Sequence, residues 1–257
     1  MPLDPKTKDR IVTTGVVIAV LVLFLPVVLP FFPSIRIETR GPSGRLSCLN
    51  NQKNVTLALM NYASQNDDTL PPPYIADENG KPMHSWRVLL LPLLDQRELY
   101  NQYRFDEPWN GPNNSKLAKR MPRCYACPDR HTKNSTTTNY LLPVGPNAAF
   151  TPGVERTLDE ISKADGQGNT ILILCDPNSN VNWLEPRDFE VETADLKALF
   201  KSAQHERKTG YWSSEMGLHI FYADGLGGIL PATTPVEVLK ALFTFNGGEV
   251  IPKEYQW

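Results

Sequence analysis

An uncharged apolar segment near the N-terminus, residues 11–32, constrains this chain more than any other feature. Its side chains are almost all aliphatic or aromatic, and none is charged. An α-helix needs about 20 such residues to cross the hydrocarbon core of a bilayer, where it satisfies its own backbone hydrogen bonds. The segment therefore predicts a transmembrane helix, with the lipid bilayer as its partner.

Two other interpretations fit parts of this segment. Lys6, Lys8 and Arg10 precede it, as in a cleaved secretory signal, but no Ala-x-Ala-like cleavage site follows. A buried core helix rarely runs this long without a polar face. Pro26 and Pro30 are expected to kink or unwind its second half. We expect a retained membrane anchor.

The anchor divides the chain into a short tail (1–10), the transmembrane helix (11–32), a linker with Pro and Gly (33–45) and one folded domain (46–257). Basic residues lie on both sides of the helix, so the positive-inside rule does not decide the orientation. The short tail favours a cytoplasmic N-terminus, which places the domain outside the cytoplasm. Lys plus Arg number 26 and Asp plus Glu 28, a net charge of −2. No basic face is indicated, so no nucleic-acid partner is expected.

The pattern after residue 45 predicts an α+β domain with a helix packed on an antiparallel sheet. A helix is expected over 45–65, with Leu46, Leu49, Leu57 and Met60 on an apolar stripe that Val55, Leu59 and Tyr62 widen. A turn is expected at 77–80, where Asn-Gly is the hairpin signal. A second helical stretch, 85–103, should be divided at Pro92. Strands are expected at 139–144, 170–175 and 218–223, the last joined by a tight turn to 228–230. Further helices are expected at 192–204 and 235–245.

An ordered set of short motifs in this domain resembles one known family, the domain of unknown function 1559 (DUF1559). The matching residues are 48–53, 57–62, 71–72, 80–92, 100–102, 127–129, 165–166, 169–171, 183, 185–188 and 221–225. The resemblance implies an envelope protein with a pilin-like or pseudopilin-like core and no established enzymatic activity. Pilin precursors carry a Glu in a Gly-Phe-Thr-Leu-x-Glu block at the start of the apolar segment. Here Val16, Val17 and Ile18 follow Gly15, so peptidase processing and fibre assembly are not expected.

The four cysteines are Cys48, Cys124, Cys127 and Cys175. Cys124 and Cys127 form a single CxxC pair, with His131 as the only nearby third ligand, which is a weak zinc signal. Outside the cytoplasm, disulfides are favoured. The family resemblance implies a disulfide between Cys48 and Cys127, which would tie the helix to the long loop. A Cys124–Cys127 disulfide and unpaired buried thiols remain alternatives.

No other sequence pattern predicts a catalytic, cofactor or metal site. The histidines have no metal-binding spacing, and no nucleophile elbow is present, so we expect no catalytic residue, no cofactor and no metal ion. Trp183, Glu185, Arg187 and Asp188 form a possible recognition loop, because an aromatic side chain and an arginine suit binding. Packing of this loop on its own sheet is the alternative.

These features favour a non-enzymatic function. We expect a single-pass envelope protein whose domain has a structural or protein-interaction role, with other envelope proteins or a second copy of itself as partners. A ligand (solute)-binding module is the second interpretation, and a large apolar pocket with converging polar groups would favour it. A hydrolase with an unrecognised site is the third, which a nucleophile and a base within hydrogen-bond reach would favour.

Overall fold

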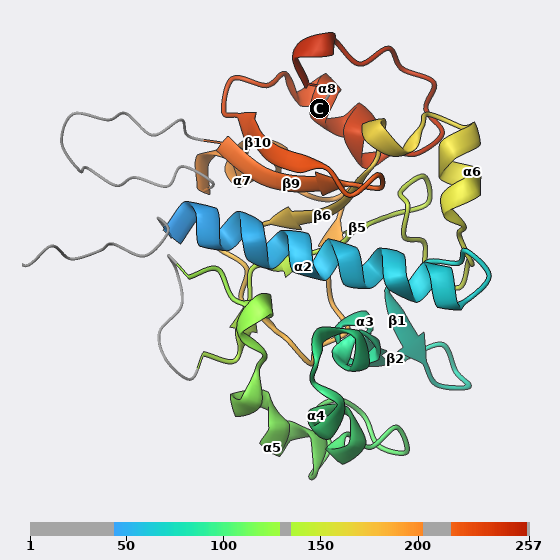
Figure 1. Ribbon diagram of the computed structural model, residues 1–257, viewed down its shortest axis with the longest axis vertical. Coiled ribbons are helices and arrows are strands. Elements are labelled where there is room, and N and C mark those ends of the chain that lie inside the picture. Colours follow the sequence, from blue (N-terminus) through green and yellow to red (C-terminus); the bar gives the residue numbers. More distant parts are fainter. Residues whose placement is uncertain (1–43, 129–134, 203–216, 256–257) are drawn as a thin grey trace, which may run out of the picture. The chain divides into compact units, whose positions relative to one another are not determined.

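The computed structural model describes residues 44–128, 135–202 and 217–255 (Figure 1). The chain divides into two units, residues 1–41 and 42–257, and all described residues belong to the second. The expected transmembrane helix at 11–32 therefore lies outside the described residues. Within the described ranges, no helix is both long and apolar enough to cross a membrane.

The domain is built around helix α2 (Gly44–Gln65) and a four-stranded antiparallel sheet in the order β10-β9-β6-β4. The sheet strands are β4 (Tyr140–Leu141), β6 (Ile171–Cys175), β9 (Gly217–Tyr222) and β10 (Gly227–Pro231). The other strands are β1 (Tyr74–Ala76), β2 (Pro82–Ser85), β3 (Thr137–Thr138), β5 (Pro143–Val144), β7 (Val181–Asn182) and β8 (Phe189–Glu190). The other helices are α3 (Trp86–Leu89), η2 (Leu91–Leu94), α4 (Arg97–Gln102), α5 (Asn114–Leu117), η3 (Ala118–Arg120), η4 (Arg123–Tyr125), α6 (Leu158–Lys163), η5 (Gln167–Asn169), α7 (Leu196–Ser202), α8 (Val236–Phe243) and η6 (Lys253–Tyr255).

Both faces of the main sheet are covered (Figure 1). Leu172 of β6 and Phe221 of β9 belong to the core that includes α2, whereas Leu174 and Ile220 belong to the core that includes α7 and α8. Every residue of β6 and β9 is buried as a result. This explains why these strands are continuous apolar runs and not alternating ones. The predicted α+β class, with a helix on an antiparallel sheet, is confirmed; the pilin-like relation stays a prediction.

The buried face of α2 is only part of the predicted stripe. The helix itself is confirmed, and Val55 and Leu59 of that stripe are buried, but Leu46 and Leu57 are 54% and 43% exposed. Gln52 is also fully buried, and its Nε2 donates a hydrogen bond of 3.2 Å to a carbonyl oxygen of β9. A buried polar residue with a partner is not visible to a hydrophobicity pattern. The buried face of the helix is therefore centred on the side that carries Gln52, Val55 and Leu59.

The segment after α2 follows the turn and proline signals. β1 and β2 form the hairpin that the Asn-Gly signal predicts, and Gly80 has the positive φ of 80° that this turn requires. Asp77 Oδ1 accepts hydrogen bonds of 2.9 Å from two backbone N–H groups of the turn. The helical stretch that follows is divided into α3, η2 and α4. Pro92 lies in the first turn of η2, where its missing N–H costs nothing, and Asp95 ends η2 with a left-handed backbone.

Helix α6 is an element that the sequence analysis missed. Thr157 caps its N-terminus: its side chain accepts a hydrogen bond of 3.1 Å from the backbone N–H of Glu160, and Glu160 Oε2 accepts one of 3.1 Å from the N–H of Thr157. This reciprocal pair is a capping box, which a Thr followed three residues later by a Glu indicates in sequence. α7 is shorter than predicted, and residues 203 and 204 of the expected helix lie outside the described residues.

We expect Thr157→Ala to lower the free energy of unfolding by about 1 kcal/mol, because the cap of α6 loses its acceptor oxygen. Urea denaturation followed by circular dichroism measures this loss. Thr157→Ser is the matched control, since it keeps the hydroxyl and should unfold at nearly the wild-type urea concentration. Equal stability of the Ala and Ser variants would show that the cap contributes nothing.

Candidate functional site

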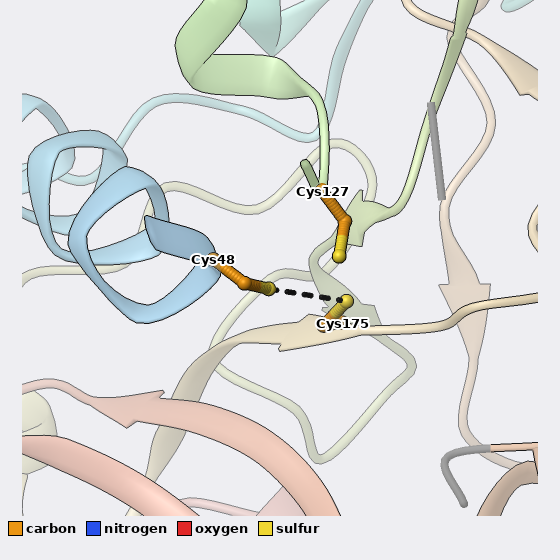
Figure 2. A group of neighbouring side chains, drawn as sticks. All are labelled: Cys48, Cys127 and Cys175. Atoms are coloured by element: carbon orange, nitrogen blue, oxygen red, sulfur yellow. Dashed lines mark hydrogen bonds between the residues drawn. The ribbon is translucent and has the colours of Figure 1, made fainter. Parts of the chain in front are cut away.

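Three of the four cysteines meet between α2 and the sheet, as Figure 2 shows. Cys48 lies near the start of α2, Cys127 follows η4, and Cys175 ends β6. Their sulfur atoms all lie within 4.8 Å of one another, and the Sγ atoms of Cys48 and Cys175 are 3.8 Å apart. The side chains point toward a common centre (Figure 2) and are 0%, 0% and 1% exposed. We call these three residues the cysteine cluster.

Local hydrogen bonds hold the three segments in place. The Nδ2 of Asn51, on α2, donates to the carbonyl oxygens of Arg123 at 3.2 Å and Ala126 at 2.9 Å, which fixes the turn that leads into Cys127. Cys175 is opposite Tyr140 in the antiparallel ladder of β4 and β6. The cluster therefore connects the long helix, the irregular segment and the central strand.

Two polar side chains face the sulfur of Cys48. The hydroxyl of Tyr140 lies 3.3 Å from it in donor geometry, and Nδ1 of His219 is also 3.3 Å away. His219 is itself buried in β9. Hydrogen bonds of this kind stabilise negative charge on a sulfur ligand. The surroundings are thus dry but supply donors to at least one sulfur.

The thiols of Cys48 and Cys175 resist ionisation in the absence of a cation. Contact with the Cys127 side chain and burial raise the pKa of Cys48, and contacts with Cys127 and Cys48 together with burial raise the pKa of Cys175. A thiol needs an electropositive setting to act as a nucleophile, and these have none. A bound metal ion reverses this, because a coordinating thiol loses its proton.

None of the four cysteines, all within the described residues, forms a disulfide. The structure brings Cys48 and Cys127 together without placing their sulfurs at disulfide distance, so the pairing that the family resemblance implies stays a prediction. Cys124 lies outside the cluster and is only partly buried, so the CxxC pair does not act as a unit. Cys175 was not linked to the others in sequence, since a cysteine at the end of a buried apolar strand gives no spacing signal.

A second buried polar group lies where α3 meets the residues before β8. Nη2 of Arg87 is 2.7 Å from Oδ1 of Asp188, with side chains 0% and 3% exposed. Asp188 also accepts hydrogen bonds from Trp86 Nε1 at 3.0 Å and from the backbone N–H of Leu142 at 2.9 Å. Burial raises the pKa of Asp188 to about 6, while the Arg87 charge opposes that rise. This ion pair is structural: it joins segments about 100 residues apart in sequence.

The possible recognition loop is mostly buried. Trp183 is fully buried, and its Nε1 donates a hydrogen bond of 2.9 Å to the carbonyl oxygen of Ala118. Asp188 is held by Arg87, as described above. Glu185 and Arg187 form an ion pair of 2.8 Å, with the Arg187 side chain 55% exposed. Of the four residues predicted for recognition, these last two are the ones that a partner can reach.

Two polar side chains that are common in catalytic sites, His84 and Ser85, have hydrogen-bonding partners inside the fold. His84 is buried, its Nδ1 lies 2.9 Å from the hydroxyl of Tyr103, and burial lowers its pKa. The hydroxyl of Ser85 caps α3 and accepts a hydrogen bond from Arg87. His131 and His205 lie outside the described residues. An open hollow of about 630 Å³ lies beside His84, Met83 and the β1–β2 turn.

A comparison with known families decides the relationship. The family model described as a protein of unknown function (DUF1559) matches residues 43–172, half of the chain. The chain belongs to the DUF1559 family. This confirms the resemblance on which the sequence analysis relied. No curated protein and no solved structure matches the chain.

The DUF1559 match covers only part of the features described above. It includes Cys48, Cys127 and Arg87, and it ends before Cys175, Asp188 and His219. Each buried group is therefore made from residues on both sides of the boundary at residue 172. Both groups need the sheet to be assembled before they can form.

Proposed function

We propose that this DUF1559 protein is a single-pass membrane protein of the cell envelope, with a cytoplasmic N-terminus and a domain outside the cytoplasm that acts through structural or protein–protein contacts. The uncharged apolar segment at residues 11–32 carries this proposal. The domain is non-catalytic and needs no cofactor for a reaction. Its partners are other envelope proteins or a second copy of the chain.

The folded domain supports this proposal in two ways. Buried His84 and Ser85 serve as hydrogen-bonding partners inside the fold. In addition, α2 exposes Leu46 and Leu57, and the turn between β9 and β10 exposes Leu226 at 52%. Exposed leucines on an ordered helix are suitable contact points for another protein. Because α2 begins directly after the expected linker, these points lie on the first folded element after the anchor.

Labelling of single introduced cysteines with a membrane-impermeant maleimide tests the topology. Asn54→Cys places a thiol on the exposed side of α2, and Thr7→Cys places one in the N-terminal tail. We expect the reagent to label N54C in intact cells and T7C only after lysis. The unmodified chain measures the background from partly buried Cys124. Labelling of T7C but not N54C in intact cells would reverse the proposed orientation.

Photo-crosslinking tests the interaction role. A photoreactive side chain at Leu57 should give crosslinks to an envelope protein or to a second copy in cells, and the same group at exposed Lys163 of α6 should give fewer. The two positions lie on different helices, so the comparison tests whether the contacts are made through α2. The same low yield at both positions would argue against contacts through α2.

Ligand binding is the second candidate function, and the hollow of about 630 Å³ favours it because ligand pockets span about 300–1,000 Å³. Its walls come mainly from one hairpin, with Asp77, Glu78 and His84 as the titratable groups. A thermal-shift screen of sugars, amino acids and short peptides distinguishes the candidates. A saturable rise in melting temperature that is lost in His84→Ala would favour ligand binding; no shift is expected for a structural domain.

A further inference from the structure

We propose that Cys48, Cys127 and Cys175 bind one soft d¹⁰ metal ion, zinc(II) or copper(I), through their three sulfur atoms. Thiolate ligands select these ions over harder cations such as magnesium or calcium. This site lies in the folded domain and needs its three thiols to be reduced. It is a structural site, because the sulfurs are closed off from solvent.

The sulfur positions already fit an ion. Sulfur ligands lie about 2.3 Å from zinc, so two of them at a tetrahedral angle are about 3.8 Å apart, and three around a trigonal ion are about 4.0 Å apart. The observed distance between Sγ of Cys48 and Sγ of Cys175 is 3.8 Å, and no pair in the cluster exceeds 4.8 Å. The side chains converge on one point (Figure 2).

The number of thiols also favours an ion over a disulfide. A disulfide bond is about 2.05 Å long and joins two sulfurs, so any pairing within the cluster leaves the third thiol buried beside the bond. Cys124 is outside the cluster and does not complete a second pair. One metal ion uses all three sulfurs at once.

The groups around the cluster suit a negatively charged sulfur–metal centre. Three thiolates with a zinc(II) ion carry a net charge of −1, and with copper(I) of −2. The Tyr140 hydroxyl and Nδ1 of His219, both 3.3 Å from Sγ of Cys48, provide partners for that charge. Zinc prefers a fourth ligand, which the three sulfurs do not supply, whereas copper(I) does not require one.

Such an ion would connect three separate segments of the fold. Cys48 and Cys175 are 127 positions apart in sequence, and Cys127 holds the irregular segment between them. A ligand that binds only the folded state raises its stability in proportion to the logarithm of its concentration. We therefore expect saturation with the ion to raise the melting temperature by about 5–10 °C for a domain of this size.

Metal titration of the full chain in detergent tests the proposal. The chain is purified under reducing conditions, stripped with a chelator and titrated with zinc(II) alone or copper(I) alone; bound metal is measured by mass spectrometry. The proposal expects one ion per chain for at least one of these metals, the rise in melting temperature given above, and sulfur scatterers at about 2.3 Å in X-ray absorption. The two titrations distinguish zinc from copper(I).

Two variants separate this site from adventitious binding. Cys175→Ala should lose the bound ion and the melting-temperature rise, while Cys124→Ala should keep both, because Cys124 lies outside the cluster. If Cys175→Ala does not fold, X-ray absorption of the wild-type chain still identifies the ligands. The absence of stoichiometric binding, ligation without sulfur, or a disulfide between two cluster cysteines in peptide maps of the native protein would overturn the proposal.

Discussion

Replacement of Arg87 by Met is expected to lower the free energy of unfolding by about 3–5 kcal/mol, since it leaves a buried carboxylate without its cation. Asp188 would keep the Trp86 and Leu142 donors but lose the 2.7 Å contact with Nη2. Urea denaturation measures the loss. An effect of this size is a large part of the stability of a typical domain, so the variant should also accumulate poorly in cells.

Two controls identify the ion pair as the cause. Arg187→Met removes a cation from an exposed pair and should cost at most about 1 kcal/mol. The double variant Arg87→Met with Asp188→Asn removes both charges but keeps an acceptor oxygen for Trp86 and Leu142. It should recover a large share of the stability that the single variant loses. A loss in Arg87→Met no larger than that in Arg187→Met would contradict the structural role of the buried pair.

The penalty in Arg87→Met should also depend on pH. Burial raises the pKa of Asp188 above its ordinary value of 3.8 to about 6 even with Arg87 present, and removal of the Arg87 charge raises the pKa further. A carboxyl whose folded-state pKa is raised takes up a proton on folding; the stability this gives is present at low pH and lost as the pH rises through the folded pKa. The variant should therefore lose more stability at pH 8 than at pH 5, whereas the Arg187→Met penalty should stay small at both.

Replacement of Trp183 by Ala is the second large effect, with an expected loss of about 3–5 kcal/mol. Its indole is fully buried, stacks on the ring of Tyr125 with centroids 6.1 Å apart, and donates a hydrogen bond to the Ala118 carbonyl. The substitution leaves a cavity in the core that includes α2, where the segments of Ala118, Tyr125 and Trp183 meet. Thermal and urea denaturation should both show the loss.

Trp183→Phe separates packing from hydrogen bonding at this position. It keeps most of the ring but leaves the Ala118 carbonyl oxygen without its donor, so we expect a loss of about 1–2 kcal/mol. Nearly wild-type stability of Trp183→Ala would mean that the side chain is exposed and available for recognition. In that case the burial of this loop described above would be incorrect.

Local signals in the sequence predicted most elements of the fold. The continuous apolar runs of β6 and β9, the Asn-Gly turn before Lys81 and the division at Pro92 depend on interactions between near neighbours, which a sequence shows directly. The burial of Gln52 on α2 could not be predicted, because its partner lies on β9, a strand more than 150 residues away. α6 was missed although its capping box is readable from Thr157 and Glu160.

The candidate site was much less predictable than the fold. No metal site was expected from the sequence, because only the CxxC pair had a ligand-like spacing. The proposed site uses one member of that pair, Cys127, with Cys48 and Cys175 from distant segments. Similarly, Asp188 was assigned only to a possible recognition loop, because its partner, Arg87, is about 100 positions away. Sites built from distant residues depend on the tertiary fold, and no short motif records them.

Membrane attachment through residues 11–32 is tested most directly by alkaline carbonate extraction of cell membranes that contain the full chain. We expect the wild-type chain to remain in the pellet, and so should the conservative variant Val20→Leu with Leu23→Val. Val20→Arg with Leu23→Arg places two charges in the segment, at about 2.5–3.5 kcal/mol each near the centre of a membrane helix, and should move the chain to the supernatant. Release of the wild-type chain by carbonate, or retention of the double-Arg variant, would contradict a membrane anchor at this segment.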